Sequence, residues 1–160
     1  MVAMNALVIT VSDRVSSGQA EDRSGPAAAE ALAELGFATT VMVVPDGVES
    51  VEGALRGAVA GKVDLVVTTG GTGMAPRDLT PEATRRVIDR EAPGLAEAMR
   101  AATFGVNPHG MLSRGVCGMA GTTLILNLPG SIAGVRESLV VVGPSLGHAV
   151  ALATGAPNTH

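Results

Sequence analysis

The stretch Val63–Glu82, VDLVVTTGGTGMAPRDLTPE, decides the fold. It begins with a short, mainly β-branched run at 63–69, which is typical of a strand buried on both faces of a sheet. A glycine-rich turn at 70–73 follows, and Thr-Pro-Glu at 80–82 predicts a helix with Thr80 as its N-cap. A strand, a turn and a helix in this order predict one unit of a parallel α/β sheet.

The same alternation continues on both sides of this stretch. The residue patterns predict further parallel strands, joined by right-handed crossovers, at 6–11, 37–44 and 122–128. They predict helices that begin at Thr80 and Pro93, and helices at 26–35, 48–60 and 131–154, the last with a break near Gly143-Pro144. Two polar or glycine-rich segments, 13–25 and 105–121, are predicted to be irregular. We expect one α/β domain over residues 1–160.

Composition narrows the function classes. Aromatic residues are 1% of the 160 residues and the net charge is −4, whereas a nucleic-acid surface usually needs a basic patch and stacking rings. No apolar run approaches the roughly 18 residues of a membrane span, and the first residues lack the charged head of a signal peptide. The lone Cys117 cannot form an internal disulfide or a cysteine-rich metal site. We therefore expect a cytoplasmic protein without nucleic-acid or membrane partners.

Charge is also sparse. Charged residues are 16% of the chain, against about 25% in typical soluble domains, and the mean hydropathy is +0.36. This balance indicates extra buried surface, such as an oligomer interface.

The glycine-rich turn is the first candidate site. In an open α/β sheet, ligands bind beyond the carboxyl ends of the strands, and successive glycines let backbone N–H groups approach an anion. Gly70, Gly71 and Gly73 can therefore cradle phosphate, with the Thr72 hydroxyl as a further donor. The alternative is a tight turn without a ligand. The pattern is neither a Walker A loop nor Gly-x-Gly-x-x-Gly.

Two aspartates follow strand ends. Asp46 follows the predicted strand at 37–44, and Asp78 follows the glycine turn. If both carboxylates face the same phosphates, they suit Mg²⁺, which is usually held by one or two carboxylates together with substrate phosphates and waters. The alternative is that Asp46 caps a helix and Asp78 closes a turn before Thr80.

Other polar groups beside glycines are weaker candidates. Arg114, next to Ser113, suits bidentate phosphate binding, or else a surface ion pair. After the last predicted strand come Asn127, Pro129, Gly130 and Ser131, where Ser131 is also a good helix cap. His109 and His148 belong to no recognisable triad or metal motif, so no nucleophilic hydrolase is indicated.

Together these motifs resemble the molybdopterin adenylyltransferases, the Mog/MoaB group, which includes the G domain of gephyrin. The resemblance covers nearly the whole chain, and Ile132 departs from the proline that often follows Pro-Gly-Ser in the family. It rests on Ser12-Asp13-Arg14 with Ser16 or Ser17 and Gly18, Asp22-Arg23-Ser24-Gly25-Pro26, Val44-Pro45-Asp46, Thr69–Gly73, Arg77-Asp78 with Thr80-Pro81-Glu82, Pro93-Gly94 with Glu97 and Met99-Arg100, Leu112-Ser113-Arg114 and Asn127–Ser131.

The resemblance implies a three-layer α/β/α fold with a mostly parallel central sheet, usually as a homotrimer. It implies that the terminal phosphate of molybdopterin attacks the α-phosphate of ATP, releasing pyrophosphate, and that a MoeA-type enzyme then inserts molybdate. By motif position, Asp46 and Asp78 would be the catalytic residues and hold Mg²⁺, and Gly70–Gly73 would cradle nucleotide phosphate. Ser113, Arg114, Asn127 and the Pro129–Ser131 turn, which includes Gly130, would shape the remaining pocket, and Ser24, Gly25 and Pro26 would line its rim.

Two other functions fit the same motifs. One is a protein of this fold that binds molybdopterin without turning it over, because every motif above can serve binding alone. The other is a molybdate-inserting or nucleotide-pyrophosphatase relative. The absence of extra domains argues against both of these relatives.

Overall fold

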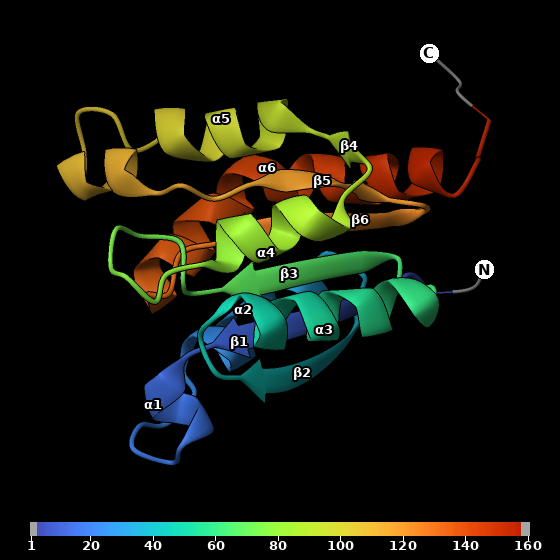
Figure 1. Cartoon of the computed structure of the whole chain (residues 1–160). Coiled ribbons are helices and arrows are strands. Elements are labelled where there is room, and N and C mark those ends of the chain that lie inside the picture. Colours follow the sequence, from blue (N-terminus) through green and yellow to red (C-terminus); the bar gives the residue numbers. More distant parts are fainter. Residues whose placement is uncertain (1–2, 158–160) are drawn as a thin grey trace.

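The computed structural model describes residues 3–157 as alternating strands and helices (Figure 1). The strands are β1 Asn5–Val11, β2 Ala38–Val44, β3 Leu65–Thr69, β4 Arg90–Glu91, β5 Cys117–Ala120 and β6 Thr123–Leu128. The helices are α1 Asp13–Ser16, α2 Ser24–Glu34, α3 Val48–Ala60, α4 Thr80–Val87, α5 Pro93–Ala101, the 3-10 helix η1 Pro108–Leu112, and α6 Ile132–Ala153.

The strands form a single six-stranded sheet in the order β2-β1-β3-β6-β5-β4. The first four strands are parallel, whereas β5 and β4 extend the sheet in antiparallel pairing. Parallel strands joined by helices end at the same edge of the sheet, so the loops after β1, β2, β3 and β6 meet there.

Helices cover both faces of the sheet and make a three-layer α/β/α fold (Figure 1). Successive strand residues point to opposite faces: Val8 of β1 packs with buried residues of α2, α5 and α6, whereas Ile9 packs with those of α3 and α4. Every residue of the central strand β3 is buried. The predicted fold class, a mostly parallel sheet between two helical layers, is confirmed.

Several local predictions are wrong. The segment 13–25 is not irregular throughout, because Ser12 caps α1 by accepting a hydrogen bond from Val15 N at 3.2 Å, and α2 begins at Ser24. Thr80 does not cap α4 but is its first residue, and its hydroxyl donates to Gly70 O at 3.0 Å. The hydroxyl thus donates to a carbonyl of another turn, whereas an N-cap would accept from a backbone N–H of its own helix.

The break predicted near Gly143-Pro144 is also absent, since α6 continues through Pro144. A proline inside a helix leaves the carbonyl four residues earlier without its N–H partner. Here that residue is Val140, which is 76% exposed, so water can solvate the carbonyl.

The segment 105–121, predicted to be irregular, contains η1 and the strand β5. Gly118 of β5 is needed for a close approach, because a Cβ there would lie 2.7 Å from Arg90 O on the paired strand β4. Glycine disfavours a strand by local propensity, and this packing requirement outweighs that preference. Among residues 3–157, no helix is both long and apolar enough to span a membrane.

Candidate active site

The glycine turn after β3 is shaped by its neighbours. Gly70 and Gly71 have φ of +94° and +68°, a region that L side chains rarely adopt. A Cβ on Gly70 would lie 2.5 Å from Val11 O, and one on Gly71 would lie 2.3 Å from Thr80 Oγ1. Gly130 in the loop after β6 is also close, since its Cβ would lie 3.2 Å from Gly70 Cα. The turn therefore needs glycine for its packing as well as for its backbone conformation.

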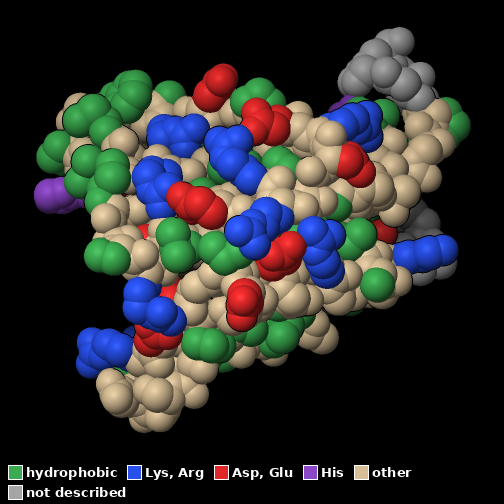
Figure 2. All heavy atoms as spheres, viewed as in Figure 1, with side chains coloured by type: hydrophobic (Ala, Val, Ile, Leu, Met, Phe, Trp, Pro, Cys, Tyr) green, Lys and Arg blue, Asp and Glu red, His purple; other side chains and the backbone are tan. Residues whose placement is uncertain are grey.

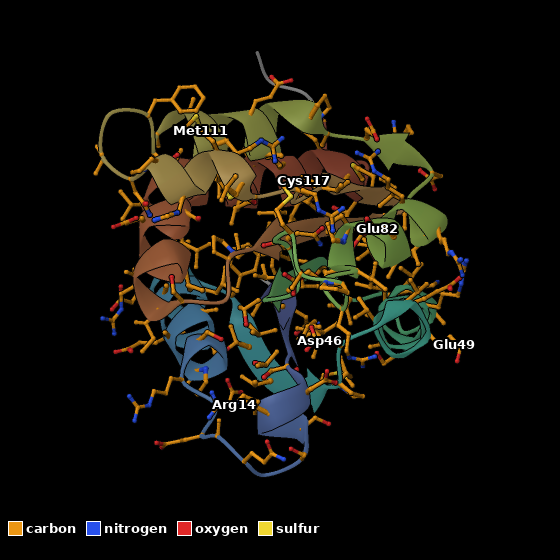
Figure 3. All side chains as sticks on the ribbon, turned by 60° about the vertical axis from the view of Figure 1, so that its left-hand side comes forward. Arg14, Asp46, Glu49, Glu82, Met111 and Cys117 are labelled. Atoms are coloured by element: carbon orange, nitrogen blue, oxygen red, sulfur yellow. The ribbon has the colours of Figure 1, made fainter. Side chains whose placement is uncertain are left out.

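Asp46, after β2, is joined to the loop after β1 by a reciprocal pair of hydrogen bonds. Asp13 N donates to Asp46 Oδ2 at 2.9 Å, and Asp46 N donates to Asp13 Oδ1 at 3.1 Å. The alternative role for Asp46, as a helix cap, is wrong, because Gly47 is the N-cap of α3 and makes no side-chain bond. In Figure 3, Asp46 lies near the middle of the view, between Arg14 and Glu82, whereas Met111 lies at the upper left.

The surroundings of Asp46 disfavour the charged form of its carboxyl group. Partial burial raises the pKa of Asp46, and the negative charges of Asp13 and Asp78 raise it further, against a hydrogen bond from the Asp13 backbone and the positive charge of Arg77. Asp78 is therefore close enough to act on Asp46, although β1 separates the two strands from which their loops start. A cation between these carboxylates would relieve the repulsion.

Asp78 also has a local role. Its Oδ2 accepts from Ala75 N at 3.1 Å, and Asp78 N donates to Ala75 O at 2.9 Å. The alternative role for Asp78, closing a turn before Thr80, is therefore present. Asp78 closes this turn by bonding to Ala75, which precedes it in the chain. A Cβ on Gly73 would lie 2.9 Å from Asp78 Oδ2, so the carboxylate lies directly against the glycine turn.

Arg114 is engaged by neighbouring loops of the protein. Its guanidinium donates to Gly73 O at 2.8 Å and Asp78 O at 2.5 Å, and it pairs with the Glu82 carboxylate. In this arrangement Arg114 supports the loop from 73 to 78. The predicted alternative, an ion pair, is therefore present, and both side chains are partly exposed, 34% for Arg114 and 41% for Glu82. The hydrogen bond from Arg114 lowers the pKa of Glu82.

Asn127 and Ser24 are also hydrogen-bonded within the fold. The Asn127 amide donates to the hydroxyls of Thr68 and Thr84 at 3.1 and 2.9 Å, and its oxygen accepts from Val116 N at 3.0 Å. The Ser24 hydroxyl lies 2.8 Å from that of Thr69 at the end of β3. These contacts hold the loops that surround the glycine turn.

The first turns of α2 and α6 complete the surroundings of the glycine turn. Gly25 packs against Asp22, whose carboxylate accepts from Gly25 N at 3.1 Å, and Pro26 follows in the first turn of α2. Ser131 caps α6 by accepting from Gly134 N at 3.0 Å, so the helix-cap alternative is confirmed for this residue. The loop that contains Pro129 and Gly130 joins β6 to this cap.

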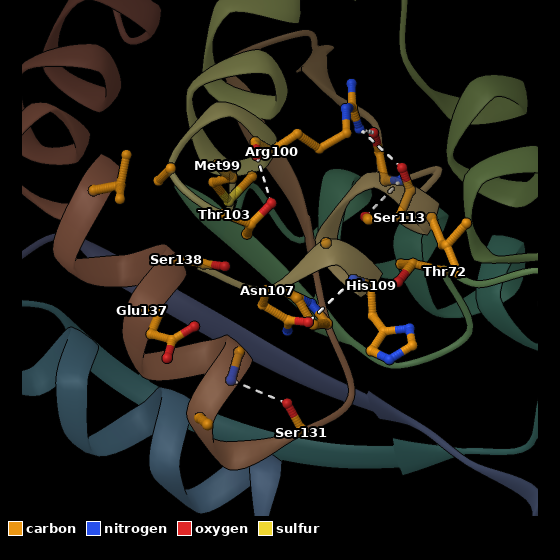
Figure 4. Close-up of a pocket in the computed structure, with 18 of the residues that line it drawn as sticks. Thr72, Met99, Arg100, Thr103, Asn107, His109, Ser113, Ser131, Glu137 and Ser138 are labelled. Carbon is orange, nitrogen blue, oxygen red and sulfur yellow. Dashed lines mark hydrogen bonds between the residues drawn. The ribbon is translucent and has the colours of Figure 1, made fainter. Parts of the chain in front are cut away.

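A pocket of about 610 Å³ opens beside the turn (Figure 4). Of the predicted site residues, it brings together Thr72, Gly73, Ser113, Asn127, Pro129 and Ser131. The others, Asp46, Asp78, Gly70, Gly71, Gly130, Arg114 and residues 24–26, lie outside its lining. The candidate site thus has two parts, the strand-end loops and this pocket.

Sequence reasoning missed much of the far wall of the pocket. That wall includes Met99 and Arg100 of α5, Thr103 just after α5, His109 of η1, and Glu137 and Ser138 of α6. The sequence indicated the segment 105–121 as a functional loop, and Met99-Arg100 only as part of the family resemblance. The α6 residues carried no signal, because helical spacing does not reveal which face of a long helix borders a pocket.

The described residues contain no group of three or more His, Cys, Asp or Glu side chains that could hold a metal. A cation at this site would therefore depend on two carboxylates and on ligands from a substrate.

Comparison with known proteins gives the family. A family model described as a probable molybdopterin binding domain matches residues 7–148. The molybdopterin adenylyltransferase of Helicobacter pylori strain J99 is 40% identical over 152 residues, which cover 92% of this chain and 86% of that protein. The chain therefore belongs to the molybdopterin-binding-domain family.

A curated relative and a solved structure extend this result. Gephyrin from Dictyostelium discoideum is 38% identical over 95% of this chain, but the chain spans only 23% of the length of gephyrin. The crystal structure of the molybdopterin biosynthesis enzyme MoaB from Thermus thermophilus is 48% identical, with a TM-score of 0.90 over 96% of this chain and 98% of that one.

Proposed function

We propose that this protein is a molybdopterin adenylyltransferase that uses Mg²⁺ and ATP. The observation that carries the proposal is the meeting of Asp46 and Asp78 against the Gly70–Gly73 turn, at the edge of the sheet where a pocket opens. The adenylyltransferase relative, similar over most of its length, supports the same activity.

The residues fit a magnesium-bound nucleotide. A Cβ on Gly71 would lie 3.3 Å from Asp46 Oδ1, so this oxygen faces the glycine turn while Oδ2 accepts from Asp13. Asp46 and Asp78 would hold the ion, and Gly70–Gly73 would accommodate nucleotide phosphate. When bound, Mg²⁺ would neutralise phosphate charge between these carboxylates and the substrate.

The proposed reaction needs no protein nucleophile. An oxygen of the terminal phosphate of molybdopterin forms a bond to the α-phosphorus of ATP, and the bond from that phosphorus to the bridging oxygen breaks, so pyrophosphate leaves. The protein contributes by orienting both phosphates and by meeting their charge. The strand-end loops, braced by Arg114, Asn127 and Ser24, are suited to that task.

The pocket suits the pterin part of molybdopterin. Binding sites for small molecules are mostly apolar with a few polar groups that set orientation, and Met99, Leu112 and Val141 lie beside Ser113, Ser131 and Ser138 here. The turn at 129–131 joins the pocket to the glycine turn. Ser24, Gly25 and Pro26 would line the rim on the other side.

We also propose a homotrimer of this single domain in the cytoplasm, with its product passed to a MoeA-type enzyme. Large apolar side chains lie exposed on the loop after α5, on η1 and on α6, among them Phe104, Val106, Met111 and Val140. Figure 2 shows green apolar side chains gathered at the upper left, where Figure 1 draws the segment after α5. A trimer mass in light scattering at micromolar concentration is expected, and a monomer would contradict it.

Pyrophosphate release from ATP, Mg²⁺ and molybdopterin tests the activity. Asp78→Ala is expected to lower kcat/KM about a hundredfold, because a group that stabilises transition-state charge is lost. Glu34→Ala, an exposed acid at the end of α2, should retain wild-type rates. Turnover of Asp78→Ala within about twofold of wild type would refute the role of Asp78. Molybdopterin binding without any pyrophosphate would identify a binding protein instead.

A further inference from the structure

Asp13 and Arg77 take no part in the function proposed above, yet both are hydrogen-bonded directly to Asp46. We propose that they form a positioning pair that holds the Asp46 carboxylate against the glycine turn. This inference rests on the proposed function, because it concerns how that site is oriented. Asp13 and Arg77 are positioning residues and do not contact the reacting atoms.

The pair connects three loops that are far apart in the sequence. Arg77 Nε and Nη2 donate to Asp13 Oδ2 and Oδ1 at 2.5 and 3.0 Å, a bidentate ion pair across 64 residues. Arg77 Nη2 also donates to Asp46 O at 2.7 Å. One guanidinium thus joins the loops after β1, β2 and β3.

Asp46 is held through both its backbone and its side chain. Its N–H donates to Asp13 Oδ1, its carbonyl accepts from Arg77, and its carboxylate Oδ2 accepts from Asp13 N. These three bonds leave Oδ1 as the oxygen that faces Gly71. Because Gly47 comes next, with a φ of +117°, the backbone after Asp46 has the freedom of a glycine, and the bonds on Asp46 limit it.

Charge favours the same arrangement. Asp13, Asp46 and Asp78 bring three carboxylates to one edge of the sheet, and the charge of Arg77 is paired with Asp13. With the Asp13 carboxylate engaged by Arg77 in this way, Asp46 and Asp78 are the two carboxylates left to meet a cation.

The experiment compares Asp13→Asn, Arg77→Gln and the double variant with wild type. Outer partners that orient a metal ligand typically contribute about 10- to 100-fold to affinity or activity. We expect each single variant to lower kcat about tenfold and to raise the Mg²⁺ concentration for half-maximal rate about tenfold. The KM for molybdopterin should change less than about twofold, because the pocket is untouched.

The double variant should lose little more than either single variant, because residues that act as a unit are not additive. Arg77→Lys should recover part of the loss, since a lysine can pair with Asp13 but cannot reproduce the planar fork. Arg85→Ala is the matched control. Arg85 is an exposed arginine of α4 that pairs with Glu91, and its loss should leave both kcat and the Mg²⁺ requirement unchanged.

Calorimetric titration with Mg²⁺-ATP gives a readout that does not depend on turnover. The variants should bind with unchanged stoichiometry but about tenfold lower affinity, whereas a merely structural role would lower the Tm and the folded fraction and leave the affinity of folded protein intact. A wild-type Mg²⁺ requirement and affinity in both single variants would overturn the proposal. A large loss in Arg77→Gln beside a wild-type Asp13→Asn would also overturn it, because Arg77 would then act on the substrate directly.

A failure of the proposed function can be distinguished from a failure of the proposed positioning role. If wild-type protein releases no pyrophosphate, the adenylyltransferase proposal is wrong, and the Mg²⁺-ATP affinities still decide whether Asp13 and Arg77 position Asp46.

Discussion

The strand-end loops and the segment 102–113 border the same site but are held in different ways. In the loops after β1, β2 and β3, side chains bond across long sequence separations, as Arg77 does with Asp13. In the segment 102–113, the hydrogen bonds described for residues 103–112 stay local, such as Val106 N to Thr103 O and His109 N to Asn107 Oδ1. Its large side chains are exposed: Val106 is 80% exposed and Phe104 62%.

The strand-end loops and the segment 102–113 therefore suit two different tasks. Groups that meet phosphate charge must be oriented before the substrate arrives, and cross-linked loops provide that. An apolar segment with local bonds can adjust to a ring or to a neighbouring subunit. The comparison predicts that changes in the strand-end loops alter stability and kcat, whereas changes in the segment 102–113 alter binding.

Gly71→Ala should give the largest effect on stability. The new Cβ would lie 2.3 Å from Thr80 Oγ1 at a φ of +68°, so strain and overpacking together should lower the free energy of unfolding by about 2–3 kcal/mol. Gly105→Ala is the control from the other region. Its φ is +77° with nothing within 4 Å of the added Cβ, so only backbone strain of about 1 kcal/mol is expected. Equal losses in urea denaturation would contradict the comparison.

Val106→Ser should change binding and leave stability alone. We expect the KM for molybdopterin to rise about threefold to tenfold through lost apolar contact, with the free energy of unfolding within about 0.5 kcal/mol of wild type. Val41→Ser is the control, because Val41 is 41% exposed on β2 and does not line the pocket. A loss of stability in Val106→Ser, with KM unchanged, would show that the segment is held as firmly as the strand-end loops.

Glu82→Gln should give the smallest effect, and one that depends on pH. Arg114 lowers the pKa of Glu82 below its usual 4.5, so the ion pair stabilises the fold at higher pH and is lost as the pH falls through the lowered pKa. Glu82→Gln should be about 0.5–1 kcal/mol less stable than wild type at pH 7, and the difference should shrink as the pH falls below the usual 4.5 and vanish once Glu82 is protonated in the folded protein. Denaturation curves at several pH values measure it. A difference that is constant with pH would rule out the ion pair as its cause.

The sequence predicted the part of the structure that follows local rules. Buried β-branched runs identified β1, β3 and β6, and parallel strands brought Asp46 and Asp78 to one edge of the sheet as expected. The site roles of these residues remain predictions. Thr80 shows where local rules stop, because its hydroxyl bonds to Gly70 in another turn instead of capping its own helix.

Long-range partners could not be predicted. Arg77 and Asp13 are 64 residues apart, and Arg114 and Glu82 are 32 apart, so each pairing depends on how the loops lie in space. The same holds for Glu137 and Ser138, whose place in the pocket is set by how α6 packs. The cap at Ser131 could be foreseen from the sequence, because serine favours the N-cap position and its bond to Gly134 N spans only three residues.

Cys117 has a practical consequence. It is the only cysteine of the chain, and burial raises the pKa of its thiol to about 12. Because the thiolate is the form that reacts with alkylating reagents, the native protein should resist thiol labelling while it is folded. A cysteine introduced by Val106→Cys would then be the one position to accept a fluorophore, so pocket occupancy could be followed by fluorescence without first removing the native cysteine.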